Sequence, residues 1–289
     1  MTRRAGFSVV EFLVVLAIIT LLLTLLIPAF MRGREAARRI TCFNNQKQLI
    51  LATHSYQASH GVLPSGCVDV VGPLAEADEK NRMSWITSLL PYLEQSGVYN
   101  AIDFDHGAFD VQNQTARATT LTTLLCPSSN IKLQNQPGPF SWTMNAPPGL
   151  DGLTSYAGCH HDVEAPIGVD APGVFFRNSR IRPIDVTDGL SQTVYIGEVA
   201  YPSKIGWLSG SRSTMRNTGH PIKQIEAEAD LDAEPPKGFV GGFGSRHAGG
   251  AIFAFGDGSA RFIKESIDPA VYRLLGNRSD GEAIDDSSY

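Results

Sequence analysis

The sequence predicts an α+β protein in which a long N-terminal helix packs on an antiparallel β-sheet with loop insertions. Two observations predict this fold class. A helical pattern runs through the first 60 residues, and later segments are short, strand-like and bounded by Gly, Pro and Asp. Gly (28) and Pro (17) also form a larger share of the 289 residues than the usual ~12%. A turn-rich head therefore fits better than a helical bundle.

Composition excludes several classes of protein. Hydrophobic residues make up 43% and charged residues 18% of the chain, which excludes a fully disordered protein. With a formal net charge of −5, the chain lacks the excess of basic residues that is typical of a nucleic-acid binder, so no nucleic-acid partner is expected. The four cysteines are too few for a disulfide scaffold and form no CxxC pair. No metal site and no cofactor are predicted.

The first element is an apolar run, FLVVLAIITLLLTLLIPAF, from Phe12 to Phe30. As a helix it would span about 28 Å at ~1.5 Å per residue, close to the ~30 Å hydrocarbon core of a bilayer. A helix packed on a soluble protein is the alternative, but the run has no polar face to show to water. A cleaved signal peptide usually has an apolar region of only ~7–15 residues, which is shorter than this run. An arginine-rich stretch, residues 31–39, follows the run instead of a cleavage site. The run predicts a membrane-spanning helix.

Glu11 stands at the edge of this apolar run. A carboxylate within a membrane-spanning helix is costly and is a functional hypothesis by default. The alternative is that Glu11 lies solvated in the headgroup layer without a function. The residues by themselves leave both interpretations open.

The N-terminus GFSVVEFLVVLAIITLLLTLLIPAF resembles the signal of type IV prepilins and type II secretion pseudopilins. The resemblance implies that prepilin peptidase cleaves after Gly6, leaving residues 1–6 as the leader, and methylates the amino group of Phe7. It also implies that Glu11 meets the amino terminus of a neighbouring subunit during assembly. Ser8-Val9 replaces the usual Thr-Leu, a mild departure from the pattern.

Two further features concern residues 7–30, the predicted assembly helix. Pro28 removes one backbone hydrogen bond and is expected to kink or loosen the helix. Four arginines follow the run and two precede it, so a positive-inside count alone would place the C-terminal side in the cytoplasm. The prepilin-like order implies the opposite orientation. The expected localisation is the bacterial cytoplasmic membrane, single-pass, with the head in the periplasm or at the cell surface.

Residues 31–60 are predicted to continue the helix as an amphipathic segment packed on the head. Its apolar stripe includes Phe43, Leu49 and Ile50, and His60-Gly61 predicts its end. The arginines of residues 32–39 either lie against anionic headgroups or form a solvated face with Glu35 between them. The solvated face is the favoured structural interpretation.

Residues 61–289 form the predicted head. Met83–Ile102 is expected to be a helix whose regularity Pro91 limits. The stretch 200–238 is expected to be an extended surface insertion. Predicted strands are Thr154–Cys159, Gly173–Phe176, Thr193–Glu198 and Ala251–Phe255.

The head resembles the bacterial DUF1559 proteins. The resemblance rests on segments in family order, ending in GSRHAGGAIFAFGDGSARFI, where nine residues separate His247 from Asp257-Gly258. The family implies no biochemical activity, and the role of this motif at 247–258 stays open. Cys42 and Cys126 lie in family-like segments and are the expected disulfide pair. Four cysteines allow three pairings, and buried thiols remain an alternative.

Two candidate sites each have a structural alternative. Asp257-Gly258 reads as a hairpin turn, which would leave His247 at the far end of the strand and make a His–Asp catalytic couple awkward. Asp185 and Asp188 could bind Ca²⁺, but the EF-hand spacing is absent and a turn is favoured. The chain has no GxSxG, GxGxxG, P-loop or HExxH motif, so it is not expected to be an enzyme.

The predicted function is that of a pilin-like or pseudopilin-like structural subunit. Its expected partners are the membrane, prepilin peptidase and other pilin-like subunits. The alternative is a membrane-tethered module that binds a glycan or envelope protein, with Trp142, Trp207 and Phe243 lining a groove. A third class, an envelope hydrolase, would need His247 to converge with Asp185 and Asp188.

Overall fold

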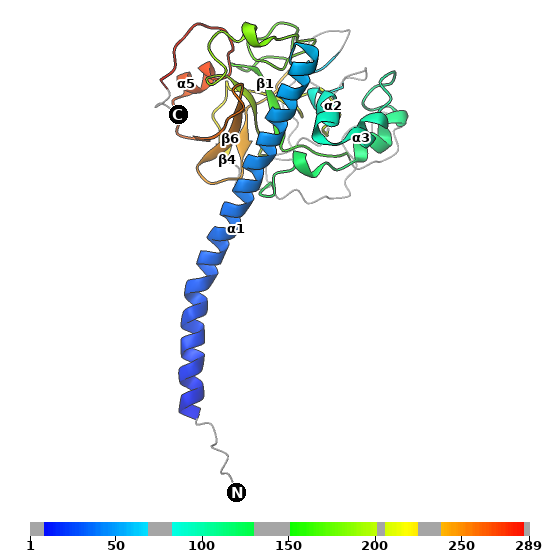
Figure 1. The fold of residues 1–289 in the computed structure, drawn as a ribbon. Coiled ribbons are helices and arrows are strands. Elements are labelled where there is room, and N and C mark those ends of the chain that lie inside the picture. The colour runs from blue at the N-terminus through cyan, green and yellow to red at the C-terminus, as the bar shows by residue number, and fades with distance from the viewer. Residues whose placement is uncertain (1–8, 69–82, 130–150, 201–205, 225–237, 286–289) are drawn as a thin grey trace.

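The computed structural model describes residues 9–68, 83–129, 151–200, 206–224 and 238–285. A long helix, α1 (Val9–His60), lies with its C-terminal half against a five-stranded sheet and projects from the head with its N-terminal half (Figure 1). The α+β class predicted from the sequence is confirmed.

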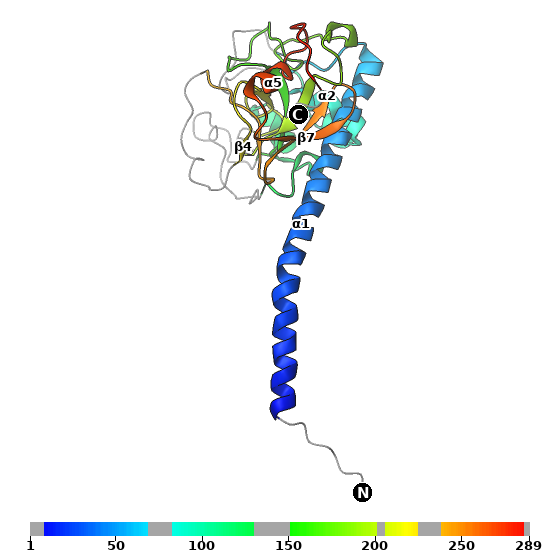
Figure 2. The ribbon, with the colours of Figure 1, turned by 90° about the vertical axis from the view of Figure 1, so that its left-hand side faces the viewer.

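α1 is a single helix with two different surroundings. From Val9 to Met31 its described apolar side chains are exposed, including Phe12 at 57% and Phe30 at 66%. Farther along, Cys42, Leu49 and Ile50 are fully buried in the head. The backbone stays helical across Pro28, and the axis curves gently (Figures 1 and 2). The helix ends as expected at His60, where Gly61 adopts a φ of +75°.

Several predictions for the N-terminal part fall outside the described residues. These are the leader, the cleavage at Gly6 and the methylation of Phe7, together with the side chains of Leu25, Pro28 and Ala29 within the expected span. Among the residues that the structure describes, no helix has the length and apolarity needed to cross a membrane.

The main sheet has the order β3-β1-β2-β6-β7 and is antiparallel except for the parallel β1–β3 pair. Its strands are β1 (Tyr156–His161), β2 (Val194–Glu198), β3 (Met215–Asn217), β6 (Gly250–Phe255) and β7 (Ala260–Lys264). A separate parallel pair consists of β4 (Lys223–Gln224) and β5 (Gly244–Ser245). The short helices are α2 (Trp85–Leu89), α3 (Ser96–Asn100), α4 (Gln114–Ala118) and α5 (Pro269–Leu274).

Strand β6 lies in the interior because both faces of the sheet are covered. Ile252 and Ala254 join the core shared with α1, whereas Ala251, Phe253 and Phe255 join a second core that includes residues of α5. Successive side chains of a strand point to opposite faces. An unbroken apolar run such as AIFAF is therefore what a strand buried on both faces requires.

Three predictions for the head are wrong in detail. The expected helix Met83–Ile102 is broken into α2, a 3₁₀ turn and α3, because Pro91 and the left-handed Glu94 interrupt it. Residues 173–176 form no strand: the backbone N–H groups of residues 173–175 bond to the carbonyls of Cys159 and His160, and that of Phe176 bonds to the Ser179 hydroxyl. The described part of 200–238 is not a surface insertion: Trp207 and Leu208 are fully buried, and β3 completes the sheet.

Candidate functional site

His247 is the centre of a buried polar cluster between α1 and the sheet. It lies in the loop before β6, with only 1% of its side chain exposed. Its Nδ1 is 2.9 Å from Glu35 Oε1 on α1, and its Nε2 is 3.3 Å from Glu198 Oε1 at the end of β2. The imidazole therefore links helix and sheet through two carboxylates.

The two carboxylates decide the charge of this cluster. Burial alone would lower the pKa of His247, but Glu198 and Glu35 outweigh it and raise the pKa above its ordinary value. Burial likewise opposes ionisation of Glu35, but hydrogen bonds from His247, Arg38 and Ser128 lower its pKa. An imidazolium between two carboxylates is the favoured state.

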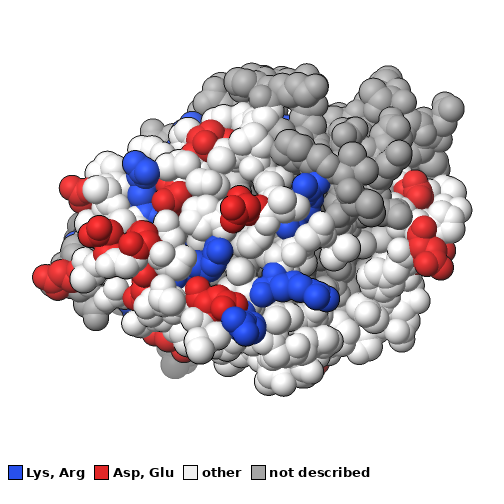
Figure 3. All heavy atoms as spheres, turned by 90° about the horizontal axis from the view of Figure 1, so that it is seen from above, with Lys and Arg blue, Asp and Glu red and all other residues white. Residues whose placement is uncertain are grey.

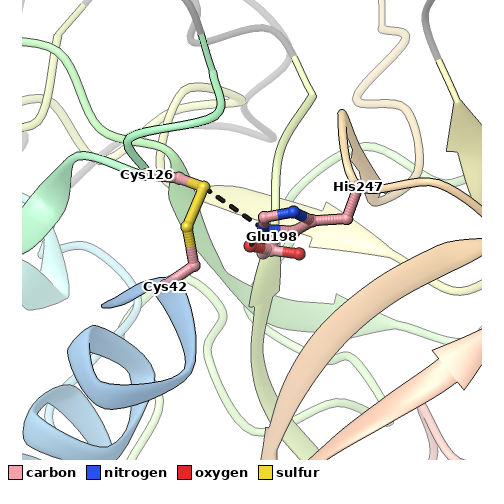
Figure 4. Close-up of side chains that lie close together, drawn as sticks. All are labelled: Cys42, Cys126, Glu198 and His247. Atoms are coloured by element: carbon pink, nitrogen blue, oxygen red, sulfur yellow. Dashed lines mark hydrogen bonds and ion pairs between the residues drawn. A yellow bond between two sulfur atoms is a disulfide. The ribbon is translucent and has the colours of Figure 1, made fainter. Parts of the chain in front are cut away.

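A disulfide joins Cys42 of α1 to Cys126, the pair expected from the family resemblance. The Cys126 sulfur is 3.5 Å from His247 Nε2, the dashed contact in Figure 4. One donor atom from each of Cys42, Cys126, Glu198 and His247 lies within 4.8 Å of the others, and all four residues are buried. Because the two sulfurs are bonded to each other, they are not thiolate ligands in this state.

Surrounding groups fix the orientation of both carboxylates. Glu198 Oε2 accepts a 2.8 Å hydrogen bond from the backbone N–H of Ile252. Glu35 accepts hydrogen bonds from Arg38 Nε at 2.8 Å and from Ser128 Oγ at 3.0 Å. Glu35 is partly solvated, as the predicted face requires, with 38% of its side chain exposed, but its carboxylate also faces His247.

The other end of the motif forms the expected turn between β6 and β7. Gly258 has a φ of +84°, a conformation that favours glycine. Asp257 accepts from the backbone N–H of Ser259 at 2.8 Å and pairs with Arg261. Asp257 thus supports the turn itself, as the structural interpretation of the motif expects.

Both ends of the motif also contact α1. His54 donates to the carbonyl of Gly256 at 2.9 Å, and Lys47 donates to that of Gly258 at 3.2 Å. Between the ends, Gln46 donates to the carbonyl of Ile252 at 2.6 Å. Together with the bond from His247 to Glu35, these contacts attach α1 to the sheet along the length of β6.

Asp185 and Asp188 do not join the His247 cluster. The Asp185 carboxylate is engaged by Arg182 through its side chain and backbone N–H, and these bonds lower its pKa to about 2. Asp188 accepts from the backbone N–H groups of Asp280 and Gly281 at 2.7 and 2.9 Å. The carboxylates that meet His247 are instead Glu35 and Glu198.

The aromatic groove that the alternative function would need does not form from the described residues. Trp207 is fully buried, Phe243 is 1% exposed, and each is part of a core. Trp142 lies outside the described residues. Glu11 is exposed on the projecting half of α1.

Sequence reasoning missed the two carboxylates that complete the cluster. One signal was available for Glu198, because a carboxylate closing the otherwise apolar segment VYIGE needs a partner if the strand is buried. No local signal marked Glu35, whose role depends on packing against a loop 212 residues away.

Comparison with known proteins places the chain in a family. The family model described as "Protein of unknown function (DUF1559)" matches residues 31–270. A 63-residue stretch is 36% identical to "Competence protein ComGC" of Halalkalibacterium halodurans, covering 22% of this chain and 62% of that protein. No solved structure matches the chain. Because the family model covers most of its length, this chain belongs to the DUF1559 family.

Proposed function

We propose that this protein is a pilin-like structural subunit. Prepilin peptidase cleaves it after Gly6 and methylates Phe7. The N-terminal half of α1 anchors it in the cytoplasmic membrane and packs against other pilin-like subunits. The head then projects outside the cytoplasm, where the Cys42–Cys126 disulfide is stable.

The division of α1 into two halves carries this proposal. The projecting half of α1 exposes apolar residues such as Phe12, Leu22 and Phe30, which is unfavourable in water. Apolar surfaces of this extent mark contacts with a membrane or with other proteins. The same helix is attached to the head by a disulfide and by the contacts along β6. Such a helix can transmit force between an embedded half and the head without separating from it.

Similarity to the competence protein ComGC adds support for a pilin-like role. The head itself favours a structural role over a groove for a ligand, since Trp207 and Phe243 belong to its cores. On the face seen in Figure 3, acidic and basic side chains are interspersed, without a broad patch of one sign among the described residues. We assign the head no catalytic role.

Substitution of Glu11 tests the assembly step. Glu11→Ala is expected to leave membrane insertion intact, because it removes a charge from the apolar segment, but to abolish co-assembly with wild-type subunits. Membrane fractionation and cross-linking of subunits in native membranes measure these two steps separately. Glu265→Ala, an exposed carboxylate on the head, is the matched control. Assembly of Glu11→Ala at the control level would contradict subunit pairing through Glu11.

A further inference from the structure

We propose that, when the Cys42–Cys126 disulfide is reduced, the buried cluster binds one Zn²⁺ ion through Cys42, Cys126, His247 and Glu198. The disulfide and the metal are then two alternative links between α1 and the sheet. This inference concerns the head and does not depend on cleavage, membrane insertion or assembly.

The donor set suits zinc. Two thiolates, one imidazole nitrogen and one carboxylate oxygen are the ligand types that Zn²⁺ takes in four-coordinate sites. The side chains come from α1, the loop after Leu124, the end of β2 and the loop before β6. All four are buried, so an ion bound there would be shielded from water, as in structural zinc sites.

Two distances between donor atoms already fit a tetrahedral ion. Zinc bonds of ~2.3 Å to sulfur and ~2.0–2.1 Å to nitrogen or oxygen separate neighbouring donors by about 3.3–3.8 Å. The Cys126 sulfur is 3.5 Å from His247 Nε2, and that nitrogen is 3.3 Å from Glu198 Oε1. The largest change that metal binding requires is separation of the two sulfurs, which follows from breaking their bond.

A second set of contacts orients the ligands as zinc sites require. A zinc-bound histidine usually gives its other ring N–H to a carboxylate, and here His247 Nδ1 faces Glu35 at 2.9 Å. Glu198 Oε2 is held by Ile252 N–H, which leaves Oε1 directed at the cluster. This buried Oε1 accepts no hydrogen bond among the described residues, and its partner is the imidazolium of His247 at 3.3 Å. Zn²⁺ would take the place of the Nε2 proton between these two atoms.

A dithiol is the reductant that opens the disulfide. The dithiol gives two electrons and two protons to the Cys42–Cys126 bond, yielding two cysteine thiols and a cyclic disulfide. Zinc then displaces both thiol protons and the proton on His247 Nε2. The products are the zinc-bound protein and three protons in solution. In the reverse direction, a disulfide oxidant takes two electrons from the thiolates and two protons from solution, which re-forms the Cys42–Cys126 bond, yields two oxidant thiols and releases Zn²⁺.

Cobalt binding to the full-length protein in detergent micelles tests the proposal. The protein is reduced with a phosphine, which cleaves the disulfide with water as co-reactant, and is titrated with Co²⁺ as a spectroscopic substitute for zinc. We expect one equivalent to bind with a thiolate-to-cobalt charge-transfer band and the visible bands of tetrahedral cobalt. The unreduced protein is expected to show neither, and added Zn²⁺ is expected to displace the cobalt.

Variants identify the ligands. Cys126→Ser should abolish tight binding, and Glu198→Gln should weaken it while keeping the charge-transfer band. Glu35→Gln should weaken binding by about 10–100-fold, the usual loss when the hydrogen-bond partner of a metal-bound histidine is altered. Cys159→Ala removes a buried thiol outside the cluster and should bind as the wild type does. Circular dichroism, recorded before the disulfide is reduced, checks that Glu198→Gln, Glu35→Gln and Cys159→Ala are folded.

Three outcomes would overturn the proposal. The first is a reduced, folded wild-type protein that binds no stoichiometric cobalt. The second is a reduced protein that unfolds and that neither Co²⁺ nor Zn²⁺ refolds. The third is binding that survives Cys126→Ser unchanged, which would place the metal elsewhere.

Discussion

Glu35 of α1 and His247, 212 residues apart in the chain, are joined by a 2.9 Å hydrogen bond from the buried imidazole to the carboxylate. This contact lies at the point where α1 leaves the head, whereas the contacts of Lys47 and His54 lie farther along the helix. The His-X9-Asp-Gly motif therefore attaches α1 at both ends of β6. A role in attachment explains the spacing without invoking catalysis, since a strand of six residues separates the two ends.

Removing the Glu35 carboxylate should destabilise the head. Glu35→Ala leaves His247 with one carboxylate partner in a buried site, a loss of about 1–3 kcal/mol in the free energy of unfolding. Chemical denaturation followed by circular dichroism measures it. Glu265→Ala, an exposed carboxylate, should change stability by no more than about 0.5 kcal/mol. Equal effects of both variants would refute a specific role of Glu35.

Gly258 is predicted to be intolerant of a side chain. Its φ of +84° is strained for other residues, and an added Cβ would approach His54 Cε1 to 3.2 Å. Gly258→Ala should cost about 1–2 kcal/mol in the free energy of unfolding. Gly97 in α3 has open space around it, so Gly97→Ala should be neutral or stabilising by about 1 kcal/mol. Similar losses at both sites would argue against the turn geometry described.

The cross-link from Cys42 to Cys126 should contribute strongly to stability. It closes a loop of 84 residues in sequence separation, and loss of such a disulfide typically costs about 2–5 kcal/mol. In the presence of a metal chelator, a phosphine reductant should lower the unfolding midpoint of the wild-type protein. The midpoint of the Cys42→Ala/Cys126→Ala double variant should not change. A wild-type midpoint that does not respond to reduction would contradict this contribution.

Glu164 is expected to make the head sensitive to acid. Burial alone would raise the pKa of Glu164, but backbone N–H groups of Val240 and Gly241, with Asn217 and His220, lower it. The resulting stability is complete above the ordinary value of 4.5 and is lost as pH falls through the lower value in the fold.

The Glu164→Gln variant tests this acid sensitivity. Measured over pH values from above 4.5 downward, its unfolding free energy should depend less on pH than that of the wild type. Glu265→Gln serves as the exposed control and should follow the wild type. A Glu164→Gln curve parallel to the wild-type curve would mean that Glu164 titrates normally in the fold.

The sequence was informative where a local pattern determines structure. Apolar patterning predicted α1, the His60-Gly61 pair predicted its end, and the flanking turn residues predicted β1, β2 and β6. The turn at Asp257-Gly258 could be predicted for the same reason. The pair Cys42–Cys126 came instead from family resemblance, since spacing alone allowed three connectivities.

The remaining features depend on tertiary packing that no local pattern encodes. β3 is only three residues long, and its pairing with β1 is parallel and distant in sequence. Residues 173–176 are apolar because they pack beneath β1, so a strand-like composition occurs there without a strand. The cluster at His247 requires α1, β2 and two loops to meet. Glu35 in particular could be assigned only from the fold.

The N-terminus of the mature protein shows most directly whether this DUF1559 protein is processed as a pilin-like subunit. Intact and N-terminal mass spectrometry of the protein from native membranes, with and without prepilin peptidase, measures where the chain starts. We expect the chain to begin at methylated Phe7 and to retain its leader when the peptidase is absent. A chain that begins at Met1 or Thr2 in the presence of an active peptidase would contradict it.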